Sequence, residues 1–198
     1  MGKSIFPVGR SLGANHDSDG NLVSFEWFRG DDILDLSPNE AVTLNFAFSN
    51  PQDHFDLKFD RSMYFKILKE QSETHSDSDI NSFIDSLLEK EVLIEVDFKS
   101  DSIDSFAKKY RIMPGAQSFG NTSDHPERFG IGGAEPILFL SGWSQVIWAV
   151  SHADGSIWRG CELLAAEDAT ATPAEVAKDF ISILPAIVST QCGFLEKI

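Results

Sequence analysis

The chain has 198 residues, of which 42% are apolar and 24% are charged, so it is long enough to bury a core without disulfides or a metal. Its 31 acidic side chains outnumber its 16 basic ones and give a net charge of −15, which opposes binding to nucleic acids and anionic lipids. Because the sequence has no apolar run of about 20 residues and no signal-peptide pattern, we expect a cytoplasmic protein without a membrane partner.

The first part of the chain predicts strands. Residues 1–20 are rich in turn formers and read as an irregular lead-in, and residues 22–28 read as a strand. Apolar and polar residues alternate over 41–48 and again over 54–59, which predicts two half-buried strands. The turn-forming residues between them predict a β-hairpin.

The hydrophobic period changes after Asp60. Helices are predicted over 62–70 and 80–91, the second from apolar residues spaced along one helical face, and a short strand follows at 92–96. A third helix is predicted from 102 to 110, with Asp101 as its N-cap and a stop at Pro114 and Gly115.

The last third predicts a meander followed by a helix. Residues 114–133 read as a long loop, and three strands are expected at 137–140, 145–150 and 156–164, with Asp154 and Gly155 forming the last hairpin turn. Thr172, Pro173 and Glu175 form a capping box, which predicts a helix from Pro173 to Leu184, before Pro185. No internal repeat is apparent.

These elements define an α+β protein. We expect an N-terminal winged helix-turn-helix-like subdomain with a β-hairpin over residues 1–98. An antiparallel β-meander with a C-terminal helix is expected over residues 99–198.

The sequence shows no phosphate-binding loop, nucleophile elbow, paired histidines or clustered cysteines, so we assign no catalytic residue, metal or cofactor. Cys161 and Cys192 read as buried thiols. Within residues 120–130, Asn121, His125 and Arg128 could bind a polar ligand or partner, although the same residues suit simple turns. A small enzyme that uses this loop remains an alternative.

Residues 42–46, 64–69 and 83–93 resemble the PqqD-like precursor-recognition domains of ribosomal peptide natural-product pathways. The resemblance spans about residues 22–97. It implies a non-catalytic subunit that binds the leader of a precursor peptide by strand addition and presents it to a modifying enzyme.

The resemblance places the peptide groove between the predicted strand at 55–59 and the helix at 83–88. The residues it implicates in peptide binding are His54, Asp56, Leu57, Lys58, Ile84, Asp85, Leu88 and Glu89. An acidic bacterial immunity or antitoxin protein that neutralises a basic toxin fits the net charge equally well. The predicted meander, together with the final helix at 176–181, also resembles a known group of bacterial immunity proteins.

Overall fold

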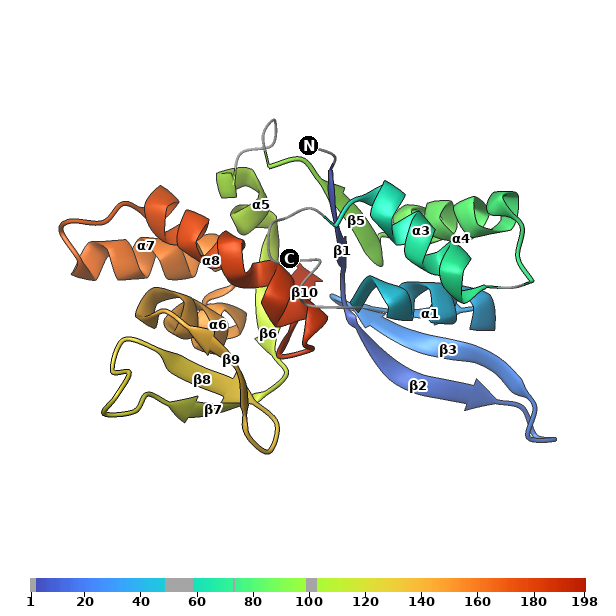
Figure 1. Cartoon of the computed structure of the whole chain (residues 1–198), viewed down its shortest axis with the longest axis horizontal. Coiled ribbons are helices and arrows are strands. Elements are labelled where there is room, and N and C mark those ends of the chain that lie inside the picture. The colour runs from blue at the N-terminus through green and yellow to red at the C-terminus, as the bar shows by residue number, and fades with distance from the viewer. Residues whose placement is uncertain (1–2, 49–58, 73, 99–102) are drawn as a thin grey trace.

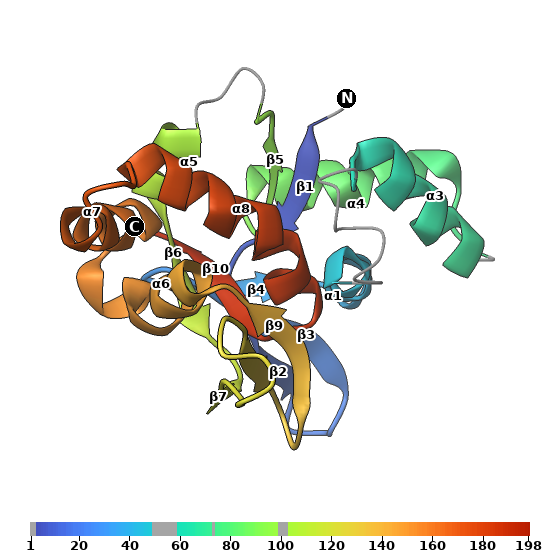
Figure 2. The same cartoon turned by 60° about the vertical axis from the view of Figure 1, so that its left-hand side comes forward.

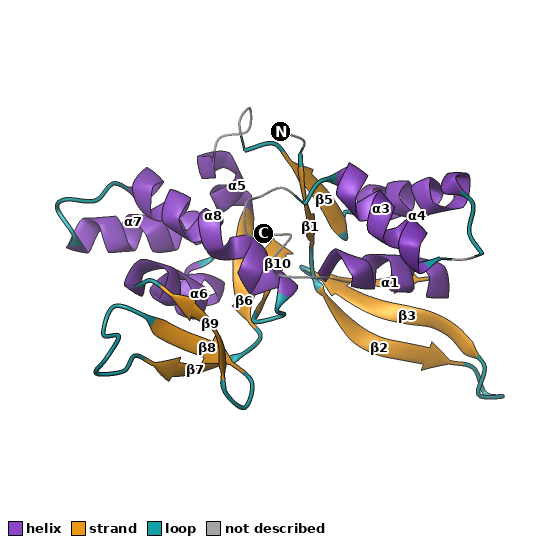
Figure 3. Ribbon diagram, in the orientation of Figure 1, coloured by secondary structure: helices purple, strands orange, loops and turns teal. Residues whose placement is uncertain are grey.

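The computed structural model describes residues 3–48, 59–72, 74–98 and 103–198. Its helices and small antiparallel sheets confirm a mixed helix–strand protein (Figures 1 and 3). The elements fall into two consecutive sets, which we call the first repeat (residues 4–96) and the second repeat (residues 110–197).

The first repeat begins with strands, continues with helices and ends with a strand. Its elements are β1 (Ser4–Pro7), β2 (Arg10–His16), β3 (Leu22–Arg29), β4 (Asp32–Leu36), α1 (Pro38–Asn45), the 3-10 helix η1 (Phe46–Phe48), α3 (Arg61–Gln71), α4 (Asp77–Glu89) and β5 (Leu93–Val96). β1 pairs with β5, and β2, β3 and β4 form a separate sheet in that order.

The second repeat follows a connecting helix, α5 (Ile103–Lys109). Its elements are β6 (Tyr110–Pro114), β7 (Gln117–Gly120), β8 (Phe129–Gly132), β9 (Pro136–Leu140), α6 (Gly142–Asp154), α7 (Ile157–Glu167), α8 (Pro173–Ser189) and β10 (Gly193–Lys197). β6 pairs with β10, and β7, β8 and β9 form a sheet in that order. The described elements therefore repeat one topology.

Backbone detail supports this internal repeat. Pro7 pairs with Leu93 in the first repeat, and Pro114 pairs with Gly193 in the second. The next residue along donates its N–H to the residue before the last strand in both cases, from Val8 to Val92 and from Gly115 to Cys192.

The turn into the last strand is also the same. Glu91 lies two residues beyond the end of α4, and Gln191 lies two residues beyond the end of α8. Their φ values are 52° and 55°, and they are the non-glycine residues with positive φ in the described part of the chain. A repeated left-handed residue at one topological position is unusual, because such a conformation costs about 1–2 kcal/mol outside glycine.

The two repeats also share a short sequence motif. The letters Ile-Leu-x-Leu-Ser occur at 33–37 and at 137–141, and both serines cap the first helix of their repeat. Ile33 and Ile137 are 61% and 55% exposed, whereas Leu36 and Leu140 are buried. Equivalent positions thus share both identity and exposure, and the expectation of no internal repeat is wrong.

Each repeat has its own hydrophobic core. The first contains Tyr64, Ile84 and Leu87 among its buried residues, and the second contains Phe180, Ile147 and Ile131. The second core also takes Phe6 and Val8 from the start of the chain. The turned view shows the helices of the first repeat on one side and α5, α6, α7 and α8 on the other (Figure 2).

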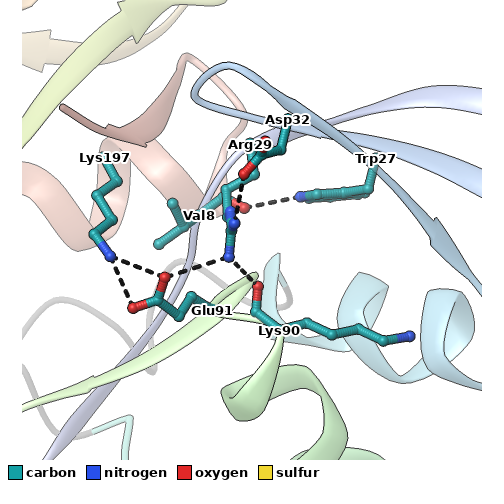
Figure 4. A network of polar contacts seen from close by, with 7 residues as sticks. All are labelled: Val8, Trp27, Arg29, Asp32, Lys90, Glu91 and Lys197. Carbon is teal, nitrogen blue, oxygen red and sulfur yellow. Dashed lines mark hydrogen bonds and ion pairs between the residues drawn. The ribbon is translucent and has the colours of Figure 1, made fainter.

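A polar network joins the two repeats (Figure 4). Both carboxylate oxygens of Glu91 lie 2.8 Å from the Lys197 Nζ of β10. Arg29, at the end of β3, lies 3.3 Å from Glu91, donates to the Lys90 carbonyl and pairs with Asp32 at 2.8 Å. These contacts tie the left-handed turn of the first repeat to the last strand of the second.

Several N-terminal predictions need correction. Residues 4–7 and 10–16, expected to be irregular, form β1 and β2. Residues 41–48, expected to be a strand, are helical, because Ser37, Pro38 and Glu40 form a capping box with proline at the first helical position. The first strand of the predicted hairpin is therefore absent, and residues 49–58, which complete the hairpin, lie outside the described residues.

The predicted C-terminal meander is also wrong beyond its first strand. Residues 145–150 lie in α6 and residues 157–164 lie in α7, with Ser156 as the N-cap of α7. Gly155 is the left-handed C-cap of α6, not part of a hairpin turn. The predicted loop at 114–133 contains β7 and β8, and β6 separates the third predicted helix from Gly115. α8 begins at Pro173 as predicted but continues through Pro185 to Ser189.

Candidate functional site

Four residues predicted to bind a peptide, His54, Asp56, Leu57 and Lys58, lie outside the residues that the structure describes. The other four lie on α4. Ile84 is completely buried in the first core, so its side chain does not line an open groove. Asp85 and Glu89 are exposed, and Asp85 accepts a hydrogen bond from Arg61 at 2.6 Å. Leu88 is half-buried against the same core.

The predicted ligand loop joins β7 to β8. Asn121 Nδ2 donates to the Pro126 carbonyl at 2.6 Å and so closes the loop on itself. His125 and Arg128 both lie 3.8 Å from the Glu127 carboxylate, and all of these side chains are exposed. The structure brings the histidine and arginine together around a glutamate, while the asparagine has a structural role in the turn.

Comparison of the two repeats identifies another candidate surface, at an edge strand. β4 and β9 occupy equivalent positions, and each is an edge strand of its three-stranded sheet among the described residues. An edge strand leaves backbone groups available to pair with another extended chain. Side chains on the strand decide whether such pairing is favoured.

The edge of the first repeat is protected by charge. β4 carries Asp32 and Asp35, and charged residues on an edge strand discourage pairing with another chain. Lys90, at the end of α4, also places its Nζ 3.3 Å from the Asp35 carbonyl oxygen. This backbone acceptor therefore already has a partner within the chain.

The β9 edge of the second repeat lacks these charges. β9 reads Pro-Ile-Leu-Phe-Leu, so proline and phenylalanine replace the two aspartates of β4. Ile137 and Phe139 are 55% and 53% exposed, while Leu138 and Leu140 point into the core. An uncharged edge strand with two large exposed apolar side chains is a candidate surface for binding another chain.

Local contacts hold this strand in place. Phe139 pairs with Gly130 of β8, where a side chain on the glycine would come within 3.5 Å of the Phe139 ring. Directly after β9, Ser141 caps α6 and donates to the Asp179 carboxylate of α8 at 2.6 Å, and Ser144 donates to the same oxygen at 2.9 Å. β9 is thereby positioned beside α6 and α8.

Sequence reasoning predicted the strand at 137–140 but not the exposure of its apolar side chains. The available signal was the repeated Ile-Leu-x-Leu-Ser, because alignment on it exposes the replacement of Asp35 by Phe139. Which edge of the sheet lies open depends on long-range pairing and could not be read from one sequence.

Both cysteines lie inside the molecule. Cys161 and Cys192 are free and buried, as predicted, and burial raises the pKa of the Cys161 thiol to about 12. No group of histidine, cysteine or carboxylate side chains suited to a metal occurs among the described residues, nor does a helix there have the length and apolar character needed to cross a bilayer.

No protein-family model, curated protein or solved structure matches the chain. The structure itself defines a mixed helix–strand protein built from two repeats of one topology.

Proposed function

We propose that the chain is a non-catalytic recognition protein that binds an extended polypeptide segment at the edge of β9. The observation that carries this proposal is the exposed Ile137 and Phe139 on an uncharged edge strand, in contrast to the protected β4. In strand addition, backbone hydrogen bonds supply affinity and alternate side chains supply specificity.

The charge of the molecule indicates the kind of segment. With a net charge of −15, the chain attracts basic partners and repels acidic ones. The expected segment alternates apolar residues, which contact Ile137 and Phe139, with lysine or arginine. The leader of a ribosomally made precursor peptide, presented to a modifying enzyme, is the partner that we propose.

The test uses short random peptides displayed on phage and selected on the intact chain. Enriched peptides are then titrated by calorimetry. Ile137→Asp and Phe139→Asp should each weaken binding at least about tenfold, because a charge would be desolvated where an apolar contact is lost.

Ile33→Asp is the matched control, since Ile33 is the equivalent residue on β4 and is similarly exposed. It should leave peptide affinity unchanged. If the β9 variants bind as tightly as the parent chain while retaining its melting temperature, the proposed recognition surface is wrong.

A further inference from the structure

A cavity of about 560 Å³ lies where the two repeats meet. Its apolar walls come from Phe25 and Trp27 of β3, Phe46 and Phe48 of η1, and Phe194 of β10. The cavity is thus lined by five aromatic rings from both repeats and falls within the size range of small-molecule sites, about 300–1,000 Å³.

The polar residues of the cavity are few and exposed. Ser11, Asn45 and Gln191 line it and lie at the surface, so the cavity opens to solvent. An apolar surface with a small number of polar groups at its mouth is the usual composition of a ligand pocket. Water molecules bind weakly to such a surface, because a well-bound water needs several polar partners.

The charge of the lining distinguishes this cavity from the rest of the surface. Among the described residues that line the cavity, Arg10 is the one charged residue. None of these lining residues is acidic, although the chain as a whole carries 31 acidic side chains. Arg10 lies 5.6 Å from the Phe28 ring centre in a cation–π contact. The lining therefore favours a neutral or anionic occupant over a cationic one.

The tryptophan of this aromatic wall has no aromatic counterpart in the second repeat. Phe25 pairs with Leu36 and Trp27 with Leu34, which makes Phe129 and Ile131 their counterparts in the second repeat. Ile131 is completely buried in the second core. Trp27 is also buried in the first core, but it lines the cavity as well, and its indole N–H donates to the Val8 carbonyl at 2.8 Å, which fixes the ring.

We propose that this cavity binds a small planar apolar molecule that carries an anionic group. The molecule stacks against the aromatic walls, and its anionic group faces Arg10. Offset and edge-to-face ring contacts give such a ligand a defined orientation. Because both repeats contribute walls, the bound molecule also links them and stabilises their junction.

The probe for this site is 1-anilinonaphthalene-8-sulfonate, a planar aromatic anion whose fluorescence rises in apolar surroundings. It is titrated into the intact chain under conditions in which unfolding is cooperative. Ala41→Phe and Ser11→Phe place a ring at the cavity wall from α1 and from the exposed β2. Each should weaken probe binding at least about tenfold by filling the site.

Gln145→Phe is the matched control. Gln145 occupies the same position after the N-cap Ser141 of α6 as Ala41 does after the N-cap Ser37 of α1. It should leave probe affinity unchanged. Arg10→Gln should weaken the sulfonate about threefold or more and leave the uncharged analogue N-phenyl-1-naphthylamine unaffected. Unchanged sulfonate binding in both cavity-filling variants would overturn the site, and equal effects of Arg10→Gln on both probes would overturn the anionic class.

Discussion

At the residue scale, Glu40 is a buried carboxylate whose ionisation bears on stability. It completes the capping box of α1 and accepts hydrogen bonds from Ser37, from Ser86 Oγ and from Lys90 Nζ at 2.7 Å. Burial opposes its ionisation, but the hydrogen bonds from Lys90, Ser86 and Ser37 outweigh burial and lower its pKa from an ordinary 4.5 to about 2. The charged form therefore stabilises the contact of α1 with α4.

A depressed pKa in the folded chain gives stability that is complete above the unfolded pKa and is lost as the pH falls through the folded pKa. We predict that Glu40→Gln lowers the free energy of unfolding by about 3 kcal/mol at about pH 7 and by much less at about pH 2. Urea unfolding across this pH range measures the effect.

Glu175→Gln is the control for that experiment, because Glu175 is the capping-box acid of α8 but is exposed. It should destabilise the chain less than Glu40→Gln. Equal effects of the two substitutions would show that the buried contacts with α4 add nothing to a simple cap.

One capping box correctly predicted a helix, and another was overlooked. Thr172 and Glu175 predicted the start of α8, because the two residues satisfy each other's backbone donors without help from the rest of the chain. Ser37 and Glu40 form the same motif, but the alternation of apolar residues after Val42 favoured a strand there. Two local signals conflicted, and the cap together with burial of Leu44 prevailed.

At the scale of elements, some helices could be recognised from their 3.6-residue period and others could not. α3 and α4 present a polar face, so their period identified them, whereas residues 145–150 are apolar on most sides and suited a strand equally well. Ser141 and Ser156, which cap α6 and α7, were the signals that distinguish the two readings.

The left-handed turns after α4 and α8 occupy equivalent positions in the two repeats, and they support a stability prediction. Gln191 has φ of 55°, a conformation that glycine adopts without a Cβ clash. We predict that Gln191→Gly raises the free energy of unfolding by about 1 kcal/mol. Urea unfolding at neutral pH measures the gain.

Gln191→Ala is the control, since alanine retains the Cβ, and it should not stabilise the chain. Glu91→Gly at the equivalent position should gain less than Gln191→Gly, because it also removes the ion pairs with Lys197 and Arg29. A glycine at 191 that is no more stable than alanine would exclude backbone strain at this turn.

At the scale of the whole molecule, the two candidate surfaces could not be predicted from the sequence. The repeats share a topology and a few letters, but equivalent positions often differ, as Glu40 and Ser144 do in the first turns of α1 and α6. The edge of β9 and the cavity at the junction both depend on strand order and on contacts between distant segments. Such features become visible only when the chain is folded.

The last prediction concerns the polar network of Glu91, Lys197 and Arg29, which joins residues far apart in the sequence. Glu91 is held between Lys197 and Arg29, and the hydrogen bond from Lys197 lowers the pKa of Glu91 below its ordinary range. Glu91→Gln keeps the size of the side chain and removes its charge. Because Glu91 and Lys197 are about half exposed, the loss should be modest, about 0.5–1 kcal/mol in low salt.

Glu89→Gln removes the same charge from an exposed neighbour at the end of α4 and serves as the matched control. In a chain with a net charge of −15, removing any carboxylate relieves repulsion, so the control should be neutral or slightly stabilising. The difference between the two variants then reports the network itself. It should shrink as salt approaches about 1 M, where exposed charges are screened within about 3 Å. Urea unfolding of both variants in low and high salt tests this, and a difference that salt does not change would show that Glu91 acts through packing and not through charge.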